Sequence, residues 1–159
     1  MKTKIEKALE EATISTFEDI CFMYPVPELK DIQKNLKLEA AAEVKYRGEF
    51  TGKLLIETRG GLFSAIAANI LSNDSPGSRQ KKDALGEIAN IICGNIVPYL
   101  GLGGRGYKIE SPKSLNKDEL LKQKSQAKPL AKVTLNFNQG RVDVKFFVDD
   151  NSAAKEKKG

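Results

Sequence analysis

Two carboxylates and one carboxamide recur at helical spacing in the segment DALGEIANIICGN, residues 83–95. Because a helix turns by about 100° per residue, Asp83, Glu87 and Asn90 fall on one line, together with Gly94. A carboxylate pairs with a cation, and a carboxamide both accepts and donates hydrogen bonds without carrying charge. The pattern predicts a polar line on the outer face of a helix, with a gap beside it where a second surface can come close.

The opposite side of the same helix is apolar. Its residues fall within an arc of about 160°, which predicts a stripe facing the core. Cys93 lies at the border of this arc, and we expect it to be packed rather than reactive. The helix is expected to run from about residue 79 to 100, which puts Asp83 in its first turn, so a purely stabilising role for this carboxylate stays open. The apolar arc consists of Ala84, Leu85, Ile88, Ala89, Ile91, Ile92 and Ile96.

The composition argues against several kinds of chemistry. The 159 residues include no histidine, and the two cysteines, Cys21 and Cys93, are not in CxxC spacing. Zinc sites, disulfide frameworks and histidine-dependent catalysis are therefore not expected. The N-terminal segment lacks the apolar core of a signal peptide, and no apolar run approaches the roughly 18 residues that span a bilayer. We expect a cytoplasmic protein without membrane contact.

The net charge of +5 raises the question of nucleic-acid binding. Much of the excess is lysine in residues 155–159 and 113–128, and acidic residues are interspersed in the second of these segments. Exposed aromatic residues beside basic ones, which single-strand binders use for stacking, do not cluster in the sequence. The sequence therefore predicts solvated lysines on loops and no nucleic-acid partner.

The segment GLGGRG, residues 101–106, matches GxGxxG letter for letter. A dinucleotide site requires the glycines to follow a strand and to open a helix, so that the helix N-terminus meets the pyrophosphate. Here they follow a predicted helix and precede a predicted strand. We interpret the segment as a helix end and a turn, not as a nucleotide site.

Hydrophobic periodicity predicts an α+β fold. The order of elements, with strands in hairpins, indicates an antiparallel or mixed sheet covered by helices. Residues 1–150 are expected to form a single domain, and residues 151–159 a disordered tail. The expected elements are helices over 4–23, 62–72 and 79–100, a hairpin through 42–46 and 50–56, a strand at 107–111, a brief helix capped by Asn116 and Glu119, and a hairpin through 133–137 and 142–148.

Asp83-xxx-Glu87-xx-Asn90, followed after the glycine loop by Pro112, resembles the motif of the CheX/CheC/FliY family of chemotaxis phosphatases. The segment ALGEIANIICGNI is similar to the helix of that family that carries the motif. The order of elements resembles the CheX type over about residues 4–148, and the chain carries one copy of the motif, which favours CheX over CheC. The resemblance implies a CheC-like/CheX-like fold.

The resemblance also implies an activity, the hydrolysis of the aspartyl phosphate of a CheY-like response regulator. In the roles it implies, Asn90 positions the attacking water and Glu87 pairs with the receiver's invariant lysine. Asp83 orients the helix, Gly94 permits close docking, and Pro112 shapes a turn near the site. An acyl phosphate is already activated and the receiver brings its own Mg²⁺, so the chain is expected to need no cofactor or metal of its own.

The expected partners are a phosphorylated CheY-like response regulator and a second copy of the chain. CheX-type relatives are dimers, and the closing hairpin is long, alternates strongly and lacks proline to blunt an edge. The alternative is a non-catalytic CheX-like module that binds a receiver domain without hydrolysis. Two departures from the family pattern leave partner identity open: the basic segment 79–82 and the lysine-rich segment 113–128.

Overall fold

The structure is a computed structural model that describes residues 2–27, 35–101, 106–124 and 128–149. Its helices are α1 (Lys4–Cys21), α3 (Leu62–Leu71), α4 (Ser78–Ile96), α5 (Lys117–Lys124) and the 3₁₀ turn η1 (Val97–Tyr99). Its strands are β1 (Leu38–Arg47), β2 (Gly52–Gly60), β3 (Lys108–Ile109), β4 (Lys113–Leu115), β5 (Ala131–Phe137) and β6 (Gly140–Val148).

The described strands form one antiparallel sheet in the order β3-β1-β2-β6-β5. Strand β4 also pairs with β1, so β3 and β4 lie one after the other along the same edge of β1. Two hairpins supply most of the sheet, and the pairing of β2 with β6 joins them. The sheet is antiparallel throughout, which confirms the predicted α+β class and resolves the choice between an antiparallel and a mixed sheet.

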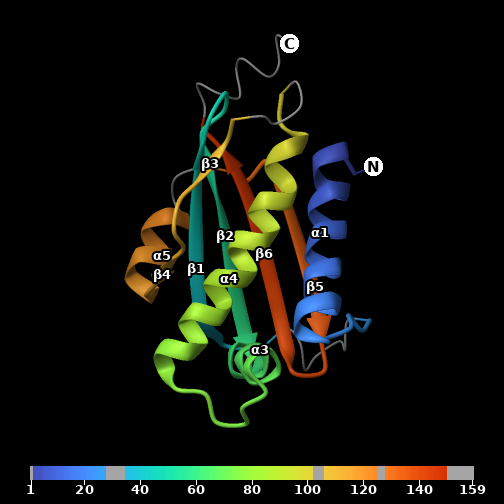
Figure 1. Cartoon of the computed structure of the whole chain (residues 1–159), viewed down its shortest axis with the longest axis vertical. Helices are drawn as coiled ribbons and strands as arrows, with labels where there is room; N and C mark the ends of the chain where they lie inside the picture. The colour runs from blue at the N-terminus through green and yellow to red at the C-terminus, as the bar shows by residue number, and fades with distance from the viewer. Residues whose placement is uncertain (1, 28–34, 102–105, 125–127, 150–159) are drawn as a thin grey trace.

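Helices α1, α3 and α4 cover one face of this sheet (Figure 1). Helix α4 packs on β1 and β2 and contacts both of the other helices on this face, α1 and α3. Leu85, Ile88, Ile92 and Ile96 are at most 1% exposed and fill the space between α4 and the sheet. Burial of this apolar stripe stabilises the helix far more than its intrinsic propensity does.

The short helix α5 lies on the opposite face of the sheet, over β1 and β2. A small second core holds it there, formed by Ala41, Leu55, Leu115 and Leu120. Its N-terminus carries the predicted cap, in which Asn116 Oδ1 accepts from the Glu119 N–H and the Glu119 carboxylate accepts from the Asn116 N–H. The capped helix follows β4 directly, so the second core also fixes the end of β4.

A polar side chain of α5 adds a second attachment to the sheet. Gln123 donates from Nε2 to Glu43 of β1 at 2.7 Å, and its Oε1 accepts from Lys53 of β2 at 2.8 Å. Burial lowers the pKa of Lys53, and the nearby Glu43 carboxylate opposes that shift. The amide of Gln123 therefore joins two neighbouring strands through opposite charges.

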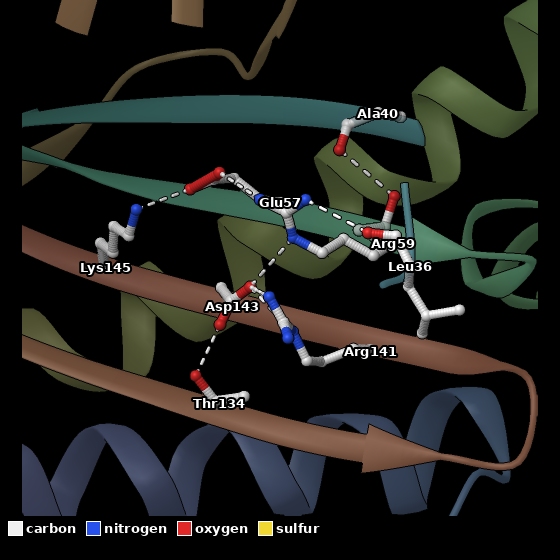
Figure 2. A network of polar contacts seen from close by, with 9 residues as sticks. Leu36, Ala40, Glu57, Arg59, Thr134, Arg141, Asp143 and Lys145 are labelled. Carbon is white, nitrogen blue, oxygen red and sulfur yellow. Dashed lines mark hydrogen bonds and ion pairs between the residues drawn. The ribbon is translucent and has the colours of Figure 1, made fainter. Parts of the chain in front are cut away.

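Charged residues of β2 and β6 form a network on the face of the sheet opposite α4 (Figure 2). Glu57 and Asp143 stand directly opposite one another, and they are 1% and 5% exposed. Like charges in this register repel. Lys145 donates to Glu57 at 2.9 Å, and the guanidinium groups of Arg59 and Arg141 lie 3.6 and 3.3 Å from Asp143, so cations surround both carboxylates.

The structure corrects two expectations for the central helix. Helix α4 begins at Ser78, so Asp83 lies in its second turn and not in the first, and its interaction with the helix dipole is weaker than expected. Ile91 is half-buried because it stands at the margin of the apolar arc. Cys93 at the other margin is fully buried, as predicted.

Strand β4 was missed in the sequence because its three residues are mostly polar and exposed. Residues 102–105 and 150–159 lie outside the described part of the chain, so the predictions of a glycine turn at 101–106 and of a disordered tail at 151–159 stay predictions. The described ends of the glycine segment follow η1 and precede β3. None of the helices in the described ranges combines the length and the apolar character needed to cross a bilayer.

Ile88→Ala is expected to lower the free energy of unfolding by about 2–5 kcal/mol, because it opens a cavity between α4 and the sheet. Ile91→Ala makes the same chemical change on the same helix at a half-buried position, and it should cost clearly less. Urea unfolding followed by circular dichroism measures both variants. Equal losses in the two variants would contradict the packing described for α4.

Candidate functional site

Helix α4 presents the predicted polar line on the side that faces away from the sheet. Asp83 and Glu87 are exposed, and Asn90 is half-buried. Among the described residues, none of these three side chains has a hydrogen-bond or ion-pair partner. The structure thus brings together, within two turns of one helix, two carboxylates and one carboxamide that are available to a partner.

Residues 109–112, which we call the flanking segment, run along one side of this line. At one end, a Cβ added to Gly94 would lie 3.6 Å from Cδ1 of Ile109. At the other end, a Cβ added to Gly86 would lie 2.9 Å from Cβ and 3.3 Å from Cγ of Pro112. Gly86, Asn90 and Gly94 are spaced four residues apart on the helix, so the flanking segment passes beside Asn90.

The position of Pro112 agrees with the prediction that it lies near the site. Gly94 is half-buried, and Ile109 of the same chain lies in ordinary van der Waals contact with the position that its Cβ would take, so its role in docking stays a prediction. Gly86 is a further residue of the site that sequence reasoning did not assign. The signal was present as a second glycine that breaks helix propensity, but its contact with Pro112 depends on the path of the chain between α4 and β4.

A cavity of about 330 Å³ opens beside the first turns of α4. Its lining includes Lys82 of α4, Phe63 of α3 and Ser114 of β4, so it continues from the end of the flanking segment. The ammonium of Lys81 lies 5.9 Å from the ring centroid of Phe63. The basic segment 79–82 therefore borders the site on its N-terminal side.

The side chains near the polar line limit the chemistry that this face of α4 can perform. Burial raises the pKa of the Cys93 thiol, on the core side of α4, to about 12, so it is protonated at neutral pH and a poor nucleophile. In the described part of the chain, no three carboxylates or cysteines come together as metal ligands. The arrangement offers charge pairing and amide hydrogen bonding to a second molecule.

Solved structures share this fold. CheX from Desulfovibrio desulfuricans superposes with a TM-score of 0.68 at 20% identity, over 92% of this chain and 100% of that chain. CheX in the CheX–CheY–BeF₃–Mg²⁺ complex from Borrelia burgdorferi gives 0.67 at 17% identity, over 94% and 100%. FliY from Thermotoga maritima gives 0.57 at 15% identity, over 98% and 91%. No curated protein sequence gives a significant match.

The fold is that of the class of CheX, CheC-like and FliY structures. Within this class, the family model described as Chemotaxis phosphatase CheX matches residues 40–136, which is more than half of the chain. The chain belongs to the CheX family, and it is a phosphatase of the chemotaxis type. The matched range spans β1 to β5 and includes all of α4 and Pro112.

Proposed function

We propose that this chain hydrolyses the aspartyl phosphate of a CheY-like response regulator, with Glu87 and Asn90 as the residues that act on it. The observation that carries the proposal is the pair itself: an exposed carboxylate and a half-buried carboxamide, one turn apart on α4 and without partners among the described residues. Membership of the CheX family supports a phosphatase, and the Borrelia burgdorferi CheX is bound to CheY in its complex.

The proposed reaction makes few chemical demands on the chain. The phosphoryl group of an aspartyl phosphate is already bonded to a good leaving group, and water attack yields inorganic phosphate and a free aspartate. Catalysis then consists of placing the water in line with phosphorus. The Asn90 amide suits this task because it accepts from and donates to water without charge that would repel the phosphoryl oxygens.

In this proposal, Glu87 fixes the orientation of the bound receiver. Its carboxylate extends from the same face as Asn90, where it can pair with a lysine of the receiver beside the phosphorylated aspartate. Asp83, one turn earlier on the polar line, orients the part of α4 that contacts the receiver in this proposal. Mg²⁺ is held by the receiver, and a response-regulator substrate places the activity in the cytoplasm.

Asn90→Ala is expected to lower stimulated dephosphorylation by roughly 10²- to 10³-fold, as removal of one pre-placed transition-state group does. Stability should hardly change, because Asn90 has no partner among the described residues. The measurement is phosphate release from a CheY-like receiver phosphorylated with acetyl phosphate. Asn95→Ala, an exposed asparagine elsewhere on α4, is the matched control and should keep full activity.

A folded Asn90→Ala protein with full activity would overturn the assignment of Asn90. Receiver binding by the unmodified chain without accelerated phosphate release would instead favour the alternative function, a CheX-like module that binds a receiver and hydrolyses nothing. The two outcomes are distinguished by measuring binding and phosphate release on the same samples.

Glu87→Gln is expected to weaken binding to the phosphorylated receiver and to lower the rate, since the change removes the charge and keeps the size. Titration of the receiver against the variant, followed by fluorescence anisotropy, measures the affinity. Glu11→Gln removes an exposed carboxylate on α1 and should leave the affinity unchanged. Full affinity and full rate in Glu87→Gln would contradict the proposed ion pair.

We also propose a homodimer formed through a sheet edge. Of the two strands in the closing hairpin, β5 lies at the edge of the sheet, because β6 pairs with β2 on one side and with β5 on the other. One end of β5 is already covered, since the Val26 N–H donates to the Asn136 carbonyl at 2.7 Å. Among the described residues, no other strand pairs with the outer edge of β5, and we propose that a second copy pairs with the rest of that edge.

Sedimentation equilibrium at micromolar concentration is expected to give twice the chain mass of 17.5 kDa. A proline at position 133, in the middle of β5, should shift the equilibrium towards monomer if that edge pairs. A wild-type mass of 17.5 kDa across the concentration series would rule out the dimer and leave the phosphatase proposal intact.

A further inference from the structure

Asn90 differs from its neighbours on the polar line in being half-buried, while Asp83 and Glu87 are exposed. The difference follows from the helix geometry. Asn90 stands four residues from Gly86 and four from Gly94, and the flanking segment contacts the helix at both of these glycines. We infer from these two contacts that the segment passes beside Asn90, whereas Glu87, which lies further round the helix, is exposed.

Hydrogen bonds to β1 fix the flanking segment at both ends. At its start, Ile109 pairs with Tyr46, and the Glu110 N–H donates to the Lys45 carbonyl at 2.8 Å. After it, Lys113 pairs with Glu43 as β4 begins. The residues between these attachments do not pair with β1, so Ser111 and Pro112 are the part of the segment that a change on α4 would displace.

Helix and segment can approach this closely only because residue 86 has no side chain. A Cβ at that position would meet Pro112 Cβ at 2.9 Å, a distance that real Cβ atoms essentially never show. The atom it meets belongs to a rigid ring, so no side-chain rotation relieves the contact. Either the proline or the helix would have to shift.

We propose that Gly86 is a positioning residue for the phosphatase reaction. Because it has no side chain, Pro112 can pack against α4, and the flanking segment packed in this way fixes the orientation of the Asn90 carboxamide. The inference rests on the proposed function, since it assigns a cause to the placement of the group that positions water. A carboxamide that is packed on one side has fewer side-chain conformations, so it loses less conformational entropy when the receiver binds. A small displacement of a group that positions the reacting water lowers kcat strongly.

Gly86→Ala tests the proposal. We expect kcat for the phosphorylated receiver to fall by about 10- to 100-fold, as misplacement of a positioned group does. KM should stay unchanged, because the exposed Glu87 that docks the receiver is not displaced. Gly77→Ala, on the same helix, is the control: a Cβ there meets only Gln80 Oε1 at 3.7 Å, and its kcat should match that of the unmodified chain.

A double-mutant cycle with Pro112→Gly tests whether the loss of kcat in Gly86→Ala is caused by the contact with Pro112. The glycine at 112 removes both ring atoms that a Cβ at position 86 would meet. Pro112→Gly alone should lower kcat, and adding Gly86→Ala to it should cause no further loss. This pair also remains informative if the single Gly86→Ala protein fails to fold, because the steric conflict is absent from the double variant.

A readout that needs no receiver separates this inference from the proposed function. In spectra of the free protein, the side-chain amide resonances of Asn90 should shift or broaden in Gly86→Ala, while those of Asn95 stay in place. An unmoved Asn90 signal, a change in KM alone, or equal losses of kcat with and without Pro112 would overturn the positioning role. Full activity in Asn90→Ala would overturn the proposed function even if the Asn90 amide signal moves as expected.

Discussion

The close packing of α4 on two sides, with a third side left to solvent, is the constraint on which the rest of the structure depends. One side of the helix fills the space above β1 and β2, a second side meets the flanking segment, and the third carries the polar line. Each side requires a different kind of residue: large apolar ones towards the sheet, glycine where the Pro112 ring approaches, and charged or amide groups towards solvent. The glycines that weaken the isolated helix are thus the residues that allow its second contact.

Much of this fold could be predicted from the sequence because its signals are local. Alternation identified both hairpins, and helical spacing identified the helices, including the capped turn at Asn116. The joining of the hairpins through β2 and β6 could not be predicted, since the paired residues are 80 to 96 positions apart, from Gly60–Gly140 to Gly52–Val148, and nothing local favours this pairing. Strand β4 was missed for a related reason, as three polar residues form a strand only because β1 offers them an edge.

The candidate site also combines features that the sequence predicts with features that depend on tertiary contacts. The line of Asp83, Glu87 and Asn90 follows from the helical period, and the structure places the three side chains as that period requires. What the sequence did not reveal is the surface beside Asn90. The contact between Gly86 and Pro112 arises from the return of the chain along β1, and the position of Ile109 against Gly94 arises in the same way. Both are tertiary contacts that override a local interpretation of the glycines.

The attachment of α5 has a consequence for the energetics of the site. Three residues after Pro112 the chain reaches Leu115 in the second core, so the shape of the active face depends on the least extensive core of the molecule. An eight-residue helix has little stability of its own and is held here by a few apolar contacts and the Gln123 amide. We therefore expect local unfolding of α5 to require less free energy than global unfolding, and to loosen the end of β4 at Leu115 while α4 stays folded. On heating, we expect such loosening to reduce catalytic competence below the temperature at which the main sheet melts.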